Sequence, residues 1–220
     1  MDRIVNMMTH CSVFRGLDPQ GLQKELLTKG HSKKYSKGTF LLLPQQELNY
    51  FAVILRGKIQ TLHQFSDGNY SIMEVFEEGE LFGADLICTK SRISPYHAVA
   101  AVDTELFLIP SQLPFVKGYL SEDFRQDLQL RLLRLVANSN MQKEYRLAIL
   151  SQKGLRERIL TYLQMQAAKR QVKSFEIPFC REDLASFLCV NRSALSHELS
   201  KMQSEGLIEF HKNRFTLLTE

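Results

Sequence analysis

The sequence has no apolar run that would cross a membrane, because no stretch of its residues approaches the roughly 18 consecutive apolar residues that a spanning helix needs. The first residues, Met1 to Ile4, also lack the apolar core and the cleavage site of a secretory signal. An apolar fraction of 44% and a charged fraction of 24% exclude a disordered or fibrous chain. We therefore expect a soluble, cytoplasmic protein that has no membrane partner.

Chemically reactive residues are few and widely spaced. Cys11, Cys88, Cys180 and Cys189 form no CxxC pair, so neither a disulfide framework nor a zinc knuckle is indicated, and we expect small buried hydrophobic residues. The histidines include no HxH pair, which argues against a cupin-type metalloenzyme, and no spacing supports haem or metal ligation by His97 and Cys88. No GxSxG elbow, Walker loop, HExxH or paired-carboxylate motif is present. The sequence predicts neither an enzyme nor a metal site.

The net positive charge of the chain lies entirely in its last third. Lysine and arginine balance aspartate and glutamate over residues 1–144, whereas residues 145–220 carry 12 basic and 8 acidic side chains. A basic lobe beside a neutral one suggests an anionic partner such as DNA for that lobe.

Short apolar runs, cut by turn residues, fill the segment from Lys34 to Pro110. Arg56-Gly57, Asp67-Gly68 and Asp103-Thr104 are turn sequences, and Asp67-Gly68 is the strongest hairpin signal among them. Such regular spacing predicts an antiparallel sandwich or barrel. The expected strands cover residues 39–43, 50–55, 58–62, 71–76, 97–102 and 105–109.

The hydrophobic period becomes helical after Pro114. Ser121 to Asp123 is a helix start, and apolar residues recur at helical spacing from Phe124 to Val136, so one long helix is expected to about Ser151. Its apolar faces exceed what a small barrel would cover, which favours a two-fold dimer seam. A helix buried against its own domain remains the alternative, because Asn138 to Asn140 is too polar for a simple leucine seam.

The last third combines helices, a tight turn and a hairpin. An amphipathic helix is expected from Leu155 to Ala168, followed by a short strand from Phe175 to Pro178. Two helical segments come next, Arg181 to Leu188 and Arg192 to Ser204, and Leu207 to Leu218 is typical of a hairpin. This layout is that of a winged helix-turn-helix.

The second helix of this motif has one apolar and one polar face. Leu195, Leu199 and Met202 recur at helical spacing and are expected to face inward, which leaves the other face free to reach base edges or phosphates. The expected DNA-binding residues are Arg181, Asn191, Arg192, Ser193, Ser196, His197, Lys212 and Arg214. A helical hairpin also serves protein contacts, so a ligand-sensing module that acts through a protein partner stays open.

Two sets of residues resemble the Crp/Fnr-type transcription regulators. Arg181 to Ala185, Val190 to Leu199 and Glu205 to Ile208 resemble the DNA-binding domain of that family. A second set of segments occurs in the same order as in the cyclic-nucleotide-binding-like barrel of that family. These segments are Tyr35 to Gly38, Ile54 to Ile59, Asp67-Gly68 and Glu78 to Gly83. The resemblance extends from about Val13 to Leu218.

This resemblance implies an α+β fold in three parts. They are an effector-sensing antiparallel β-barrel of the double-stranded β-helix or jelly-roll type over 1–118, a dimerisation helix over 119–151, and a winged helix-turn-helix over 152–220. It also implies a homodimer that binds a palindromic site in double-stranded DNA and contacts RNA polymerase if it activates transcription. The effector pocket would include Gly79, Glu80, Leu81, Phe82, Gly83, Ala84, Ser94, Pro95 and Tyr96.

Departures from the family pattern limit what the resemblance implies. Members that bind cyclic AMP have a Glu where this chain has Ala84, and an Arg-Ser pair near Ser94-Pro95. Because a buried phosphate without a guanidinium is costly, cyclic AMP is not the expected effector, and the effector stays unknown. Cys11 alone cannot supply the thiolates of an iron–sulfur centre. Ser193 and His197 replace the family's Glu and Arg, so the usual half-site is not expected, and His197 contacts either guanine or a phosphate.

Overall fold

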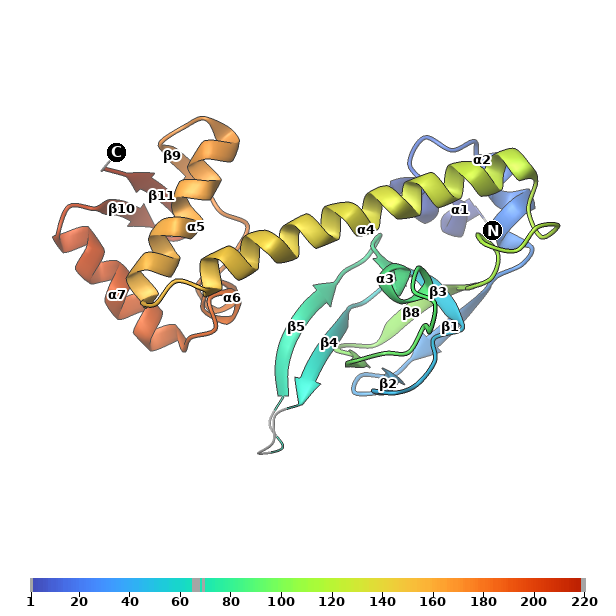
Figure 1. Ribbon diagram of the computed structural model, residues 1–220, viewed down its shortest axis with the longest axis horizontal. Coiled ribbons are helices and arrows are strands. Elements are labelled where there is room, and N and C mark those ends of the chain that lie inside the picture. Colours follow the sequence, from blue (N-terminus) through green and yellow to red (C-terminus); the bar gives the residue numbers. More distant parts are fainter. Residues whose placement is uncertain (1, 65–67, 69, 219–220) are drawn as a thin grey trace. The chain divides into compact units, whose positions relative to one another are not determined.

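The computed structural model describes residues 2–64, 68 and 70–218, and the chain forms two compact units, one ending at Ser139 and one beginning at Asn140 (Figure 1). The helical elements are α1 (Asp2–His10), α2 (Pro19–Leu22), the π-helical turn η1 (Gln23–Leu27), α3 (Ala84–Ile87), α4 (Glu122–Leu150), α5 (Leu155–Arg170), α6 (Arg181–Phe187) and α7 (Arg192–Ser204). The strands are β1 (His31–Tyr35), β2 (Phe40–Leu42), β3 (Tyr50–Arg56), β4 (Ile59–Gln64), β5 (Tyr70–Phe76), β6 (Leu81–Phe82), β7 (His97–Ala100), β8 (Thr104–Pro110), β9 (Ser174–Glu176), β10 (Ile208–His211) and β11 (Arg214–Leu217). Over the described part of the chain, no helix is both long enough and apolar enough to span a membrane.

Two antiparallel four-stranded sheets make up the centre of the first unit. Their strand orders are β1-β8-β3-β6 and β2-β7-β4-β5, so each described sheet ends in edge strands. Side chains from both sheets, including Leu42, Ile54, Ile59 and Leu106, share one buried cluster. Of the antiparallel sandwich or barrel expected from the sequence, the structure has the sandwich, because the two described sheets are antiparallel and are not closed on each other. The hairpin expected at Asp67-Gly68 is supported by the antiparallel pairing of β4 with β5, but Asp67 itself lies outside the described residues.

Strand β3 is buried on both faces, which explains its unbroken apolar run. Ala52 and Ile54 point into the sandwich, whereas Phe51 and Val53 belong to a second cluster on the other side of the same sheet. That cluster also takes in residues of the N-terminal helices and of α4, namely Phe14, Leu22, Leu26, Leu128 and Leu132. The N-terminal helices and the first half of α4 thus cover one face of the sandwich.

Polar contacts tie the start of α4 to the N-terminal segment. The Ser121 N–H donates to Oε2 of the buried Glu25 at 3.2 Å, which satisfies a backbone donor at the helix start. Further along α4, Nη1 of Arg131 donates to the carbonyl oxygens of Val13 at 3.2 Å and Arg15 at 2.8 Å. Any displacement of residues 13–25 therefore acts directly on α4.

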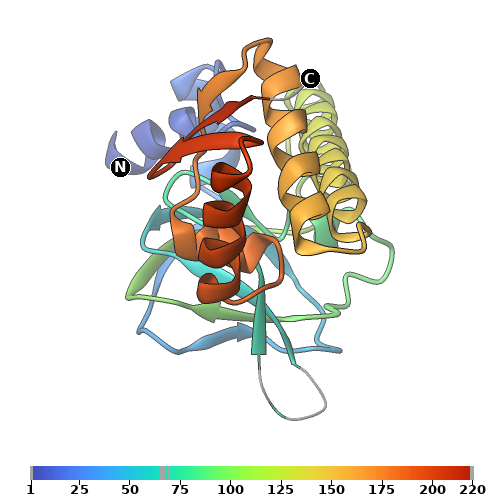
Figure 2. The ribbon, with the colours of Figure 1, turned by 90° about the vertical axis from the view of Figure 1, so that its left-hand side faces the viewer.

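The second unit forms a single core around α5, α6 and α7. Leu184, Leu195, Leu199 and Met202 are buried there, and Ile149 adds the last turn of α4 to the same cluster. Strands β9, β11 and β10 form an antiparallel sheet in the order β10-β11-β9. Figure 2 shows α7 beside α5, next to the hairpin of β10 and β11. The winged helix-turn-helix layout expected from the sequence is confirmed.

The expected burial of the cysteines is wrong for three of the four. Only Cys11 is buried, whereas Cys88, Cys180 and Cys189 are exposed. Cys180 instead caps α6, because its Sγ accepts from the Asp183 N–H at 3.4 Å. Cys189 lies in the turn between α6 and α7 with a φ of 56°, a left-handed conformation that costs energy for any residue with a Cβ.

Candidate nucleic-acid interface and effector region

Helix α7 begins with a side-chain cap and is held inward by three apolar residues. Oδ1 of Asn191 accepts from the Ala194 N–H at 2.7 Å and from the Ser193 hydroxyl at 3.2 Å. Leu195 and Leu199 are fully buried one helical turn apart. These contacts confirm the sequence-based orientation of the helix and determine which of its faces remains outside.

The outward face of α7 carries the residues expected to read DNA. Arg192, Ser193 and His197 are exposed, and Ser196 is half-buried beside them. Nη1 of Arg192 lies 4.0 Å from Oε2 of Glu182, but both side chains are mostly in solvent, so this pair holds the guanidinium weakly. Four adjustable donors are thus presented on one exposed helix surface, with the positive N-terminal end of the helix beside them.

The hairpin of β10 and β11 presents Lys212 at its tip and Arg214 at the start of β11, both exposed. Lys212 has a φ of 54°, so the turn is tight, and Asn213 anchors it by accepting from the Ile177 N–H at 2.9 Å. The Arg181 guanidinium donates from Nη2 to the Lys212 carbonyl oxygen at 3.1 Å. The structure therefore brings Arg181, Lys212 and Arg214 together at one edge.

Arg181 itself is largely occupied within the protein. Its guanidinium carbon lies 4.9 Å from the ring centre of Phe210 and 5.7 Å from that of Phe215, a stacked arrangement. Burial, together with the neighbouring charge of Arg192, lowers the pKa of Arg181. Its stacking and its hydrogen bond to the turn show that Arg181 supports the hairpin, whatever it contributes to DNA.

Several basic residues of the last third serve internal contacts that the sequence did not indicate. Arg158 donates from Nη1 to the Leu188 carbonyl oxygen at 3.3 Å, and Arg146 donates from Nε to that of Phe187 at 3.4 Å. Both cations lie at the C-terminal end of α6, where the helix dipole favours positive charge. The positive excess of residues 145–220 is therefore only partly available to an anionic partner.

The expected effector residues fall into two groups in the sandwich. Leu81, Phe82, Gly83, Ala84 and Ser94 are buried, Tyr96 is half-buried and Pro95 is exposed. Gly79 and Glu80 instead line a separate cleft of about 660 Å³ against His10 and Arg15 of the N-terminal segment.

Tyr96 and Asp85 form a negatively charged, hydrogen-bonded pair beside the first of these two groups. The Tyr96 hydroxyl donates to both carboxylate oxygens of Asp85, at 3.3 and 3.2 Å, and Ser94 Oγ donates to the Tyr96 carbonyl oxygen at 2.7 Å. Burial raises the pKa of Tyr96, and the charges of Asp85 and Glu74 raise it further. Asp85 is a functional candidate that sequence reasoning missed, since a single Asp after Gly83-Ala84 has no distinguishing pattern.

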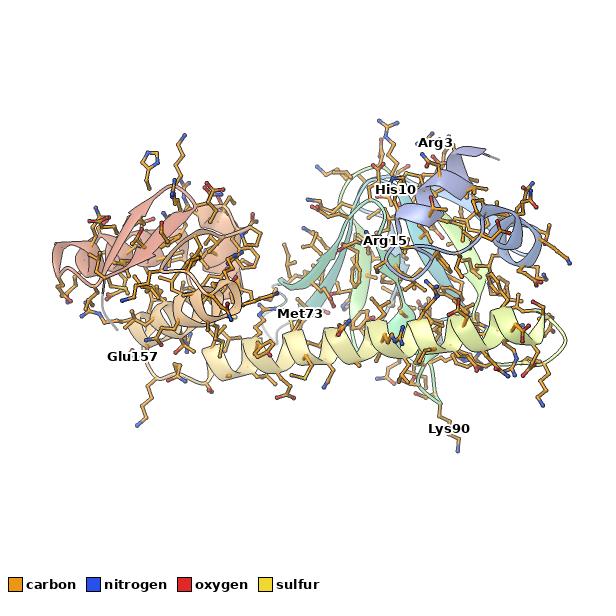
Figure 3. All side chains as sticks on the ribbon, turned by 90° about the horizontal axis from the view of Figure 1, so that it is seen from above. Arg3, His10, Arg15, Met73, Lys90 and Glu157 are labelled. Atoms are coloured by element: carbon orange, nitrogen blue, oxygen red, sulfur yellow. The ribbon has the colours of Figure 1, made fainter. Side chains whose placement is uncertain are left out.

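His97 and Cys88 do not meet. The His97 ring packs edge-on against Phe40 at 5.7 Å and against Tyr70 at 5.4 Å between ring centres. Cys88 lines a different small cleft beside Lys90, whose side chain projects away from the ribbon (Figure 3). Within the described ranges, no group of three or more His, Cys, Asp or Glu side chains could hold a metal ion.

Comparison with known proteins matches both units to characterised domain families. Residues 32–113 match the cyclic nucleotide-binding domain, and residues 157–220 match the Crp-like helix-turn-helix domain. A "Probable transcriptional activator" of Rhizobium leguminosarum bv. viciae is 20% identical over 216 residues, which cover 94% of this chain and 85% of that protein. The fold is shared with FixK2 from Bradyrhizobium japonicum (19% identity, TM-score 0.56, 86% of this chain and 93% of that one). It is also shared with the Thermus thermophilus catabolite activator protein (19% identity, TM-score 0.56, 94% of this chain and 93% of that one).

A cyclic nucleotide-binding domain followed by a helix-turn-helix whose reading face is exposed defines a DNA-binding regulator with an effector-binding domain. The chain belongs to the Crp/Fnr-type transcription regulators, and the resemblance noted from its sequence is confirmed. It is a transcription regulator and not an enzyme.

Proposed function

We propose that this regulator is a cytoplasmic homodimer that reads a palindromic DNA site through α7 and contacts RNA polymerase if it activates transcription. The observation that carries the DNA proposal is the two-faced α7, with Leu195 and Leu199 fully buried and Arg192 and His197 exposed. Base edges are contacted by Ser193, Ser196 and His197. Contacts to phosphates, which orient the protein on the duplex, come from Asn191, Arg192, Lys212, Arg214 and Arg181. We divide the chain functionally into residues 1–118, 119–151 and 152–220.

Exposed apolar residues on α4 support the homodimer. Leu130 and Leu133 are 44% and 64% exposed in the first unit, and Met141 and Tyr145 are each 49% exposed in the second. Each pair is spaced so that its two side chains lie on the same side of the helix. A monomer would leave these side chains in water, whereas a second copy of α4 would bury them.

The effector of the sandwich is proposed to be neutral or cationic, not cyclic AMP. A cyclic phosphate placed beside Tyr96 would lie near the carboxylates of Asp85 and Glu74, whose charges already act on that hydroxyl. An anion in this environment is disfavoured by repulsion and by the loss of its hydration. Cyclic AMP should therefore leave the thermal unfolding temperature unchanged, and a saturable increase would contradict this part of the proposal.

Control of DNA binding would pass from the sandwich to α4. Glu25 and Arg131 connect the N-terminal segment to α4, so movement of that segment alters how two α4 helices meet. In the dimer this moves the two copies of α7 toward or away from a separation of about 34 Å, one turn of DNA.

Selection of random duplex DNA on the purified full chain, without ligand and at moderate salt, tests the proposal directly. The expected result is an inverted repeat with half-site centres about 10 base pairs apart. A motif without two-fold symmetry would contradict the homodimer. If the ligand-free chain recovers no motif, the selection is repeated in the presence of cell extract, which supplies an effector.

A protein partner in place of DNA is the second candidate, favoured by the internal use of Arg146 and Arg158. Salt dependence separates the two functions. Affinity for DNA falls steeply as salt rises because phosphate contacts release counterions, whereas a protein contact of this size need not follow that law.

A further inference from the structure

Arg156, in the first turn of α5, holds two carboxylates of α7 at once. Its Nε donates to Oε1 of Glu198 at 2.6 Å, and its Nη1 and Nη2 donate to the two oxygens of Glu205 at 2.6 and 3.2 Å. Glu198 lies in the middle of α7 and Glu205 is its C-terminal cap. A single planar guanidinium therefore bridges two points on the helix that the sequence places seven residues apart.

Helix geometry puts this bridge on the flank of α7 away from its DNA-reading residues. At roughly 100° per residue, positions seven apart point in nearly the same direction when the helix is viewed down its axis. Glu198 and Glu205 therefore share one flank. The buried Leu195 marks the direction of the core. Around the helix axis, Ser196 lies on one side of this direction and Glu198 on the other. Arg156 is thus positioned to fix the rotation of α7 without standing between α7 and a duplex.

The three side chains are shielded enough for the bridge to matter. Arg156, Glu198 and Glu205 are 29%, 19% and 36% exposed, in contrast to the solvent-exposed pair of Arg192 with Glu182. Charge-assisted, two-pronged arginine contacts are also more directional than contacts of lysine, because the guanidinium fork matches a carboxylate. The apolar contacts of Leu195, Leu199 and Met202 determine which face of α7 is buried. The directional contacts of Arg156 add a second constraint on the rotation of the helix.

We propose that Arg156 is the positioning residue that sets the rotation of α7, and thereby the base preference of the regulator, through its shared bridge to Glu198 and Glu205. It does so without touching DNA. Its single positive charge also offsets part of the negative charge of the two carboxylates, which would otherwise repel the phosphates of a bound duplex more strongly. This inference rests on the proposed reading role of α7.

The test compares Arg156→Gln with Lys169→Gln, which removes one positive charge from the same helix α5 at an exposed site. Both full-length variants enter the duplex selection used for the parent chain, and their affinities for the recovered site are measured over a salt series. Arg156→Gln is expected to lower the affinity for that site roughly tenfold and to flatten the base preference at positions read by Ser196 and His197. The slope of affinity against salt should stay unchanged, because no phosphate contact is lost.

Two results would overturn the proposal. A salt slope reduced by about one, with base preference intact, would make Arg156 a phosphate contact. If Arg156→Gln and Lys169→Gln had the same affinity and the same base preference, Arg156 would have no role in base recognition. If the parent chain recovers no motif either without ligand or in the presence of cell extract, the reading role of α7 fails independently of Arg156.

Amide hydrogen exchange in the DNA-free protein tests whether the bridge of Arg156 to Glu198 and Glu205 stabilises α7. Residues 192–205 should exchange faster in Arg156→Gln than in Lys169→Gln, and equal rates would contradict the bridge itself. Glu205→Gln, which removes the two-pronged partner and keeps Arg156, is expected to reproduce the loss of base preference. In the double variant Arg156→Gln/Glu198→Gln the two effects should be less than additive, because both changes break the same contact.

Discussion

Arg146 lies over the ring of Phe187, with its guanidinium carbon 5.3 Å from the ring centre, and its Nε donates to the carbonyl oxygen of the same residue. Arg146 belongs to the last turns of α4 and Phe187 to the end of α6, so the contact joins the long helix to the helix-turn-helix. The same ring packs against Phe179 and Tyr162, at 5.0 and 5.4 Å between ring centres. A movement of α4 therefore reaches the DNA-binding core through an aromatic cluster as well as through the chain.

Replacement of Arg146 by Gln should weaken the second unit. The change removes a cation from an aromatic face and from the end of α6, worth together about 1–2 kcal/mol. The thermal midpoint of the full chain is then expected to fall by roughly 2–4 °C for each kcal/mol lost. Lys143→Gln, an exposed change on the same helix, is the matched control. An equal shift in both variants would show that the Phe187 contact contributes nothing.

Cys189→Gly should stabilise the protein. Cys189 has a φ of 56° in the turn between α6 and α7, and glycine adopts this conformation without a Cβ clash. The expected gain is about 1 kcal/mol in the free energy of unfolding, measured in urea. Ser186→Gly, in the right-handed helix α6 just before this turn, should instead lose about 1 kcal/mol. Destabilisation by both changes would mean that the Cys189 side chain holds the turn.

Tyr162→Phe should stabilise the protein and flatten its alkaline pH dependence. The Tyr162 hydroxyl is buried, and among the described residues it has no hydrogen-bond partner, so its removal should gain about 1 kcal/mol at neutral pH. Burial raises the pKa of Tyr162 from 10.0 to about 12. The folded protein then keeps the phenol neutral where the unfolded chain ionises it.

The sign of that dependence follows from the raised pKa. The contribution of Tyr162 is fully present below pH 10 and is lost as the pH rises from 10 to about 12. Urea unfolding of both proteins across this range should show the parent chain losing stability relative to the Phe variant. Parallel curves would contradict the raised pKa.

Glu25→Gln should loosen the start of α4 and change the acid limb of stability. Burial alone would raise the pKa of Glu25, but hydrogen bonds from Ser121 and the charges of Lys29 and Lys24 together hold it below its usual value. The carboxylate therefore contributes stability above pH 4.5, and this contribution disappears as the pH falls through the folded-state pKa. We expect Glu25→Gln to lose about 1–2 kcal/mol at neutral pH.

The acid dependence of Glu25 is measured by urea unfolding between pH 6 and about pH 3, where paired carboxylates titrate. The difference between the parent chain and Glu25→Gln should shrink as the pH falls. Exposed Glu78→Gln serves as the control. A difference that stays constant with pH would show that Glu25 does not act as a charged cap.

His197→Ala and Lys212→Ala should have different effects on DNA binding. Loss of a base contact by His197 is expected to cost roughly 1–3 kcal/mol at the preferred site and to relax preference at one position. Loss of a phosphate contact by Lys212 should weaken binding to all sequences and reduce the salt slope by about one. Affinity measurements on the selected site and on a scrambled duplex decide this. If His197→Ala lowered the affinity for both duplexes equally, His197 would be a phosphate contact and not a base contact.

Local patterns predicted most of the strands and all the long helices. The helix expected from Ser121 to about Ser151 is α4, and the segment expected at Arg192 to Ser204 is α7. Strand β1 was missed because its HSKKY side chains are mostly exposed, so it has no hydrophobic alternation. Its backbone pairs with β8, about seventy residues further on, and only that pairing makes it a strand.

The sequence by itself determined the class of the protein, because the helix-turn-helix and its reading residues form one short contiguous segment whose periodicity shows which face is buried. Only the tertiary structure decided how the charged residues are used. Arg156 meets Glu198 and Glu205 from 42 and 49 residues away, and Arg181 meets Lys212 from 31. The Asp85 carboxylate meets Tyr96 only because the loop between them turns back into the sandwich. Periodicity cannot supply such pairs, since electrostatic partners are set by distance in space and not by spacing along the chain.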